Sequence, residues 1–430
     1  MKQITWDCLS EKERRLALSR PAQAASAEVK EIVRRIIEEV KARGNAAVRG
    51  FTEKFDKIKL GDFKVSPQEF KAAQKKVSSK EKAALKKAAE NIFKFHQAQK
   101  PRDIKIKIMD GVVCEWRARP VEKAGLYVPA GTAPLPSTLL MLGIPSKIAG
   151  CERRIVCTPP NRSGEVHPAT LLAAELCGIR DVYKIGGAQA IAAMAYGTES
   201  VPKMDKIFGP GNAYVTEAKL QAAQDPDGAA MDLPAGPSEV MILADAKANA
   251  AFVAADLLSQ AEHAANAQAV LVTTDKIFAG KVEAEIEKQL RTLPRQDFAR
   301  AAIANSFVIF VKDLNEAVEV SNAYAPEHLI IQVEKPEKCL EKIRHAGSIF
   351  LGPWSPEPVG DYASGTNHVL PTSGCARAFG GVTLMSFMKT MTVQKLTRDG
   401  LRALGPVVET LAAMEGLEAH KRAVSVRLEK

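Results

Sequence analysis

The spacing of apolar residues changes near residue 120 of this 430-residue chain. Before that point the spacing is mostly helical. It predicts a helix over residues 28–43 and one amphipathic, lysine-rich helix over residues 71–100. The first 22 residues are charged and lack apolar periodicity, so we expect them to form an arm.

After residue 119, short β-branched runs alternate with alanine-rich helical stretches. One such series covers residues 154–223 and a second covers residues 239–333. This alternation is typical of parallel sheets built from βαβ units, so it predicts an α/β fold with two Rossmann-like, doubly wound lobes. Residues 397–430 predict a small tail of two helices. Because so short a tail cannot bury its apolar stripe alone, it needs a docking surface.

Composition sets limits on the class of protein. Hydrophobic residues make up 46% of the chain and charged residues 26%, as in ordinary globular proteins. The uncharged run over residues 124–146 contains four prolines, which argue against a membrane span. No signal peptide is expected, and seven cysteines without a CxxC pair favour a reducing cytoplasm over a disulfide scaffold or a zinc ribbon.

The net charge of +10 comes from the first part of the chain. Residues 1–120 hold 29 Lys and Arg against 16 Asp and Glu, whereas the remaining residues are slightly acidic. No aromatic residues are interleaved with these lysines in a stacking pattern. We therefore favour a solvated helix face over a nucleic-acid surface.

Three glycine-rich turns are predicted between strands and helices, over residues 127–138, 186–187 and 209–212. Glycine lets a ligand approach the backbone, and the N-terminus of the following helix favours an anion. None of the turns matches the GxGxxG dinucleotide motif. A role in turn geometry alone therefore remains the alternative.

The predicted helix over residues 249–264 carries polar side chains on one side of an otherwise apolar surface. Asp256, Gln260 and His263 fall on one arc of this helix. Buried side chains of these types need partners. An internal hydrogen-bond network would satisfy them, and so would a metal held by Gln260 and His263.

Two further places carry candidate chemistry. The adjacent Glu327 and His328 follow a proline that suggests the first turn of a helix, where they could act as general acid and base. A glutamate that complements the helix dipole beside an exposed histidine is the alternative. Asp361 and His368 lie in an irregular stretch over residues 360–381, which is rich in Gly, Ser and Thr as functional loops often are.

Other histidines and cysteines lack such settings. His96 and His167 are interpreted as structural or surface residues. Cys151 and Cys157 are candidates for a thiolate that attacks an aldehyde, but a small buried hydrophobic role is the favoured interpretation.

Taken together, the motifs resemble those of histidinol dehydrogenases, in order and over nearly the whole chain. The segments that carry the resemblance are GLYVPAGTAPLPST (125–138), GGAQAIAAMAYGT (186–198), FGPGNAYVTEAK (208–219), DLPAGPSE (232–239), LLSQAEH (257–263), AYAPEHL (323–329), GDYASGTNHVLPTSG (360–374) and EGLEAHKRAV (415–424). The family more often has Pro-Gly-Gly where this chain has Pro129-Ala130-Gly131.

The resemblance implies the last step of histidine biosynthesis, the oxidation of L-histidinol to L-histidine through L-histidinaldehyde. It also implies two NAD molecules per turnover and one zinc ion per subunit. The site residues that it implies are the zinc ligands Gln260, His263, Asp361 and His420, the acid/base pair Glu327 and His328, the NAD contacts Tyr127, Gln189 and Asn212, and the substrate contacts Ser238, His368 and Glu415, together with the zinc ligands and His328.

For the organisation of the chain, the resemblance implies a cytoplasmic homodimer whose tail reaches the partner's site, with no nucleic acid or membrane as partner. The expected domains are an arm (1–22), a larger α/β domain (23–127 with 238–382), a second, NAD-contacting α/β domain (128–237) and the helical tail (383–430). A zinc hydrolase with the same ligands and a nucleic-acid binder are the rival hypotheses.

Overall fold

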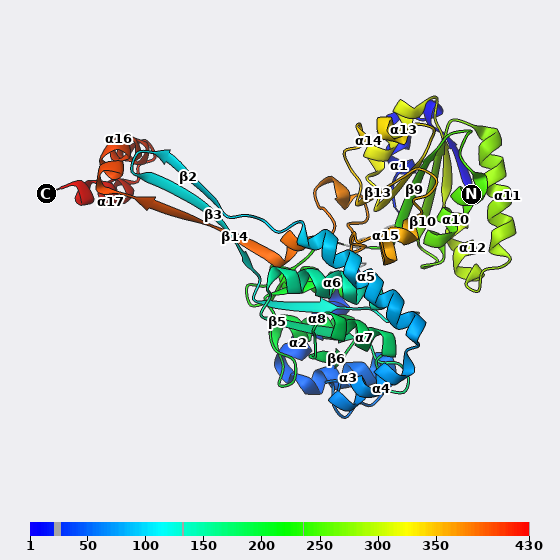
Figure 1. Cartoon of the computed structure of the whole chain (residues 1–430), viewed down its shortest axis with the longest axis horizontal. Helices are drawn as coiled ribbons and strands as arrows, with labels where there is room; N and C mark the ends of the chain where they lie inside the picture. The colour runs from blue at the N-terminus through cyan, green and yellow to red at the C-terminus, as the bar shows by residue number, and fades with distance from the viewer. Residues whose placement is uncertain (21–26, 131–132, 235, 430) are drawn as a thin grey trace.

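The computed structural model describes residues 1–20, 27–130, 133–234 and 236–429. Two of the sheets in the described residues are parallel and form separate lobes, and a third, antiparallel sheet extends away from both (Figure 1). Helices pack on both faces of each parallel sheet, which confirms the predicted pair of doubly wound lobes.

Lobe B is built on a sheet with the strand order β6-β5-β4-β7-β8. Its strands are β4 (Lys123–Tyr127), β5 (Arg153–Thr158), β6 (Val182–Lys184), β7 (Lys206–Phe208) and β8 (Ala230–Met231). Helices α6 (Pro136–Ala149), α7 (Pro168–Leu176), α8 (Gly187–Tyr196) and α9 (Ala213–Gln224) connect them, and α2 (Ala27–Arg43), α3 (Asn45–Asp56), α4 (Pro67–Lys76) and α5 (Ser79–Gln97) pack outside.

Lobe A has the strand order β1-β11-β10-β9-β12-β13. Its strands are β1 (Lys2–Thr5), β9 (Glu239–Ala244), β10 (Gln268–Thr273), β11 (Phe307–Phe310), β12 (His328–Gln332) and β13 (Ser348–Leu351). Its helices are α1 (Glu11–Ala17), α10 (Ala250–Ala261), α11 (Lys276–Leu290), α12 (Gln296–Asn305), α13 (Leu314–Tyr324), α14 (Pro336–Leu340) and α15 (Glu357–Tyr362). Apart from β1, the strand order is the same as in lobe B. The strand that comes first along the chain, β9 here and β4 in lobe B, lies in the middle, and later strands are added on both sides of it.

The described part of the expected N-terminal arm is instead part of lobe A. Strand β1 pairs in parallel with β11, and Trp6 and Leu18 are buried in the core of that lobe. A four-residue edge strand is too short to show a period of two in the sequence, which explains why residues 1–20 look like an arm.

The expected grouping of residues 23–127 with residues 238–382 also differs from the structure. Val33, Ile36 and Val40 on the apolar side of α2 are buried against α8 and α9, so this helix belongs to lobe B. The helix predicted over residues 28–43 is confirmed. The apolar stripe predicts that one face of this helix is buried, but it does not indicate in which of the two lobes the helix packs.

The single lysine-rich helix predicted over residues 71–100 is two helices, α4 and α5. Val77 adopts an extended conformation, and the Ser78 side chain accepts a hydrogen bond from the Glu81 backbone N–H at the start of α5. The Glu81 side chain in turn accepts a hydrogen bond from the Ser78 N–H. This reciprocal capping box starts a new helix inside a stretch whose composition is helical throughout.

The tail contains more than the two predicted helices. Strand β14 (Met388–Leu396) pairs with β3 (Val112–Pro120), which pairs with β2 (Ile104–Met109), in an antiparallel sheet. Helices α16 (Arg398–Met414) and α17 (Glu418–Leu428) pack together at the far end of this sheet (Figure 1). Gly416 has a φ of 71° between them, a left-handed conformation that ends α16.

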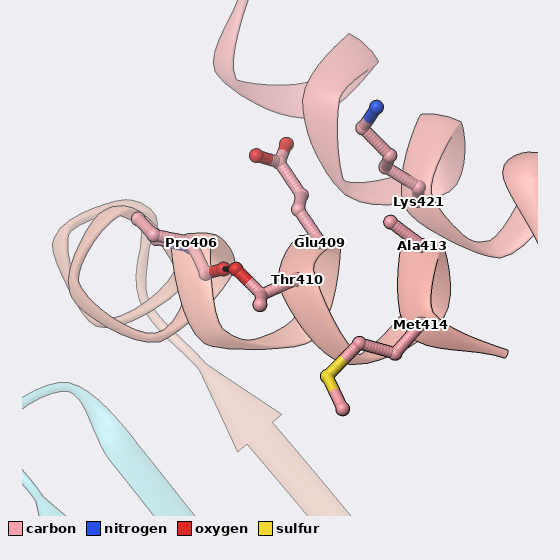
Figure 2. A pocket seen from close by; sticks show the side chains of 6 residues that line it. All are labelled: Pro406, Glu409, Thr410, Ala413, Met414 and Lys421. Carbon is pink, nitrogen blue, oxygen red and sulfur yellow. Dashed lines mark hydrogen bonds between the residues drawn. The ribbon is translucent and has the colours of Figure 1, made fainter.

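The tail carries apolar surface that the described residues of this chain do not cover. Ile108 on β2 is 60% exposed and Met414 on α16 is 78% exposed. A pocket between α16 and α17 is lined by Pro406, Glu409, Thr410, Ala413, Met414 and Lys421 (Figure 2). None of the described helices is both long and apolar enough to cross a bilayer.

Candidate active site

Glu327 and His328 lie at the amino edge of lobe A, the edge at which its parallel strands begin. The predicted helical turn at this position is wrong. Ala325 ends α13 in a left-handed conformation, Pro326 follows, and His328 is the first residue of β12. The proline therefore marks the end of one helix rather than the start of another.

His328 is buried, and its two ring nitrogens have different surroundings. Its Nδ1 lies 3.1 Å from the carbonyl oxygen of Glu239. A carbonyl only accepts, so Nδ1 carries a proton and donates it. The other nitrogen, Nε2, lies 3.5 Å from Asp361 Oδ1 and 3.9 Å from Glu357 Oε1. Burial by itself lowers the pKa of His328, but the neighbouring carboxylates, Glu327 foremost, raise it above its usual value.

The carboxylate of Glu327 is buried beside the same imidazole. Its Oε2 accepts a hydrogen bond of 2.8 Å from the Glu239 N–H and lies 3.6 Å from His328 Nδ1. Burial raises the pKa of Glu327 to about 8. A carboxyl group with a pKa near neutrality can give up and take back a proton under physiological conditions, as general acid/base work requires.

A candidate metal site adjoins His328. His263, Glu357 and Asp361 each offer a ligand atom, and these atoms all lie within 4.8 Å of one another. His263 follows the C-terminal end of α10, whereas both carboxylates belong to α15. The α10 helix runs back from the end of β9, which brings its C-terminus to the edge where the strands begin.

Gln260 fits the same site. It is fully buried near the end of α10, and neither amide atom of its side chain has a hydrogen-bond partner among the described residues. Buried amides are normally paired, so unpaired ones beside a cluster of ligand atoms fit a bound ion. The mixed nitrogen and oxygen donors of Gln260, His263 and Asp361 suit zinc.

Asp256, on the same arc of α10, has another role. Its carboxylate accepts a hydrogen bond of 2.8 Å from the Gln332 side chain in β12. The alternative of an internal network is therefore confirmed for Asp256, while His263 offers a ligand atom to the candidate metal site.

Glu357 was missed by the sequence reasoning. It is 1% exposed, its Oε2 accepts a hydrogen bond of 2.8 Å from the Ser259 hydroxyl, and burial raises its pKa to about 7. The available signal was its position four residues before Asp361. On a helix this spacing places both carboxylates on one face.

His368 connects the two lobes at this site. Its Nδ1 donates to the Asp361 carbonyl oxygen at 2.7 Å, and its Nε2 lies 2.9 Å from the Thr138 hydroxyl. Thr138 belongs to the first turn of α6 in lobe B. Ser238, just before β9, is half-buried and accepts a hydrogen bond from the Gln268 N–H through its carbonyl oxygen. The amino edge of lobe A thus lies against the carboxyl edge of lobe B.

The three glycine-rich turns follow β4, β6 and β7, as predicted, at that carboxyl edge of lobe B. Residues 131 and 132 of the first turn lie outside the described residues. A Cβ on Gly209 would lie 2.0 Å from the Tyr127 carbonyl oxygen, so only glycine permits this close approach of β4 and β7. These two strands flank the point where the strand order reverses, which is where α/β sheets bind ligands.

The implied NAD contacts surround these turns. The Tyr127 side chain is buried, and its hydroxyl oxygen accepts a hydrogen bond of 3.0 Å from the Gly187 N–H. Gln189 is buried in α8, with an Oε1 that has no hydrogen-bond partner in the described ranges. Asn212 is exposed and caps α9 through the backbone N–H groups of Tyr214 and Val215.

Glu415 and His420 are not brought to the site within one chain. Both are exposed in the tail, and α17 lies at the opposite end of the antiparallel sheet from α10 and α15 (Figure 1).

The structure agrees with the interpretations of the other histidines and of the two cysteines. His96 is buried and bonded to the Ile92 carbonyl oxygen, and His167 caps α7. Cys151 and Cys157 are buried, and burial raises the pKa of each thiol.

Comparison with known proteins assigns the chain to a family. The family model for histidinol dehydrogenase matches residues 18–428. Histidinol dehydrogenases of Vibrio cholerae and Vibrio parahaemolyticus are 53% and 52% identical over 430 residues, which cover 100% of this chain and 99% of each relative. The crystal structure of histidinol dehydrogenase from Elizabethkingia anophelis has a TM-score of 0.95 at 48% identity and covers 100% of this chain and 98% of its own. The chain therefore belongs to the histidinol dehydrogenase family.

Proposed function

We propose that the amino edge of lobe A is the catalytic centre at which this chain performs the reaction of its family. As a family member, the chain is an oxidoreductase of histidine biosynthesis that oxidises histidinol. The observation that carries the proposal is the cluster of His263, Glu357 and Asp361 ligand atoms within 4.8 Å, beside the buried Nε2 of His328.

Zinc would be held by Gln260, His263 and Asp361, with His420 supplied by a second copy of the chain. When bound, it supplies a Lewis acid that polarises substrate oxygen atoms and orients the substrate. The buried, unpaired amide of Gln260 supports the ligand set. The C-terminal end of α10, where the helix dipole is negative, favours a cation at this position.

Lobe B would bind NAD at its carboxyl edge, around Tyr127, Gln189 and Asn212. The support lies in the glycine turns, whose backbone a ligand can approach closely, and in the starts of α8 and α9, where the positive end of the helix dipole favours an anionic pyrophosphate. When bound, NAD accepts one hydride in each of the two oxidation steps. The hydrogen bond between Thr138 and His368 keeps this edge next to the catalytic centre.

His328 would act first. Its Nδ1 proton is committed to the Glu239 carbonyl oxygen, so Nε2 is the ring nitrogen that exchanges protons, and once deprotonated it is the base that removes the hydroxyl proton of histidinol. Loss of that proton from the hydroxyl oxygen, and of one hydride from the carbon that bears the hydroxyl group, leaves the aldehyde. Ser238, His368 and the partner subunit's Glu415 are the proposed contacts that keep the substrate oriented.

Glu327 would act in the second oxidation. Its Oε2 is held by the Glu239 N–H, which orients the carboxylate, and the Glu327 carboxylate removes a proton from the water that adds to the aldehyde. The hydrated aldehyde then loses a hydride and a proton to give the carboxylic acid. Both oxidations use the same centre, so the reactive aldehyde can stay bound between them.

We also propose that the chain forms a homodimer in the cytoplasm. The exposed apolar residues of the tail and the distance of α17 from the site support a homodimer with exchanged tails. The cysteines, none of which pairs with another among the described residues, support a cytoplasmic location.

Purified protein incubated with histidinol and NAD tests the function. We expect two NADH molecules per histidinol, measured by absorbance at 340 nm, and about one zinc per chain by elemental analysis. Metal-dependent turnover of substrate esters or amides without NADH would instead favour the zinc hydrolase. A salt-dependent mobility shift with nucleic acid would favour the nucleic-acid binder.

A further inference from the structure

One residue outside the proposed catalytic set contacts both members of the acid/base pair through its backbone. Glu239 is the first residue of β9. Its N–H donates to Glu327 Oε2 at 2.8 Å, and its carbonyl oxygen accepts from His328 Nδ1 at 3.1 Å. The two peptide groups on either side of one Cα atom therefore orient both side chains.

The side chain of Glu239 is itself anchored on both oxygens. It is 1% exposed and receives two parallel hydrogen bonds from Arg20, from Nε to Oε1 at 2.9 Å and from a terminal nitrogen to Oε2 at 2.8 Å. The backbone N–H of Ser373 donates to Oε1 at 2.8 Å. A paired guanidinium fixes the direction of a carboxylate as well as its distance, which a lysine cannot do.

Arg20 is held in turn. Its guanidinium carbon lies 3.6 Å from the centroid of the Tyr324 ring, which is fully buried. The Tyr324 hydroxyl donates to the Gln268 side chain at the start of β10, the strand next to β9. The ion pair is therefore enclosed by the same sheet edge that carries the catalytic pair, and neither of its members can reorient freely.

We propose that Arg20 and Glu239 are positioning residues for catalysis. The ion pair fixes the Cα of Glu239, and so the two peptide groups that set the tautomer of His328 and the direction of the Glu327 carboxylate. This inference rests on the proposed function of Glu327 and His328. It gives the N-terminal segment a role in the reaction, although that segment touches no reacting atom.

The test compares Arg20→Ala with a matched control in the same segment. Arg14 also lies over an aromatic ring, that of Trp6, and donates to the Trp6 carbonyl oxygen at 3.2 Å, but it does not contact Glu239. In the metal-loaded protein, we expect Arg20→Ala to lower kcat by roughly ten- to a hundredfold, because small misplacements of reacting groups have effects of that size. We expect little change in KM for histidinol or NAD, and wild-type kcat for Arg14→Ala.

Chemical rescue separates positioning from folding. Millimolar guanidinium should occupy the space left in Arg20→Ala and restore part of kcat, while it should not raise the kcat of Arg14→Ala. Arg20→Lys and Glu239→Gln serve if Arg20→Ala does not fold, and both should show lowered kcat in folded protein. Wild-type kcat in any folded variant of Arg20 or Glu239, or a loss in folded Arg20→Ala that guanidinium does not restore, would overturn the inference.

Glu327→Gln and His328→Asn are measured beside these variants. If both retain full activity, the proposed function itself fails. If both lose activity while folded Arg20→Ala keeps it, only the positioning role fails.

Discussion

The two lobes share one strand order but present opposite edges of their sheets to each other. Lobe B presents its carboxyl edge, where glycine turns follow β4, β6 and β7 and helices begin. Lobe A presents its amino edge, where β9 and β12 begin and α10 ends. The strand order of a doubly wound sheet therefore does not by itself decide which edge becomes a site.

The difference follows from the charge of the ligand that each edge would hold. Helix N-termini with exposed backbone N–H groups suit the anionic pyrophosphate of a dinucleotide. Helix C-termini and carboxylates suit a cation, and the ligand atoms of Asp361 and Glu357 lie within 4.8 Å of that of His263, which follows the end of α10. One lobe offers mainly backbone atoms and the other offers titratable side chains.

The largest expected effect is that of Glu327→Gln on the second oxidation. The amide keeps the shape of the side chain but cannot accept a proton from water, so this step should slow by about a hundredfold or more. The alcohol step relies on His328 and should slow less. Histidinol and histidinaldehyde supplied separately resolve the two steps, and equal losses would contradict the assignment.

The next effect concerns His420, the proposed zinc ligand that a second copy of the chain would supply. His263→Ala and His420→Ala homodimers should each be inactive, whereas mixed dimers should regain up to about half of wild-type activity, because one site then has both intact histidines. Tagged subunits verify that exchange has occurred. Baseline activity after verified exchange would mean that the tail does not act across the dimer.

Glu357 is not among the zinc ligands that the resemblance implies. A substitution at this position tests whether it contributes to zinc binding at the amino edge of lobe A. Glu357→Gln keeps a hydrogen-bond acceptor for Ser259 but removes a charge from the cluster. We expect zinc affinity to fall by about ten- to a hundredfold, the size of effect typical of groups around a metal. Competition with a chelator measures it, and unchanged affinity would limit Glu357 to a role in packing.

Lys219→Met tests the carboxyl edge of lobe B. Lys219 and Asp232 are both 1% exposed, and together they hold the N–H and carbonyl oxygen of Gly209. Removal of one partner leaves a buried charge and should lower the free energy of unfolding by about 3–5 kcal/mol. KM for NAD should rise more than KM for histidinol. Denaturant unfolding and steady-state kinetics measure the two effects, and an equal rise in both KM values would contradict a role confined to NAD.

The smallest effect is expected at the buried thiols. Cys151→Ala and Cys157→Ala should leave turnover near normal and lower the free energy of unfolding by about 1 kcal/mol, as core truncations of this size do. Both thiols are buried in the hydrophobic cores of lobe B. Loss of aldehyde oxidation in a folded variant would replace the water-based route with a thiol-based one.

Part of the candidate site could be predicted from local sequence. His263 and Gln260 share one face of a helix, and Glu327 and His328 are adjacent, so their proximity needs no knowledge of the fold. Glu357 was missed although its spacing from Asp361 was readable. The contact between Arg20 and Glu239 could not be predicted. The two residues are 219 positions apart in the sequence, and neither segment has a local pattern that indicates its partner.

By itself, the sequence determined the order of strands and helices, and with it the two doubly wound lobes, because alternating periodicity and glycine turns are local properties of the chain. Only the tertiary structure decided that the first 20 residues join lobe A, that α2 joins lobe B, and that lobe A presents its amino edge to lobe B. An apolar stripe indicates that one face of a helix must be buried. Which surface covers that face depends on the packing of segments that are distant in sequence.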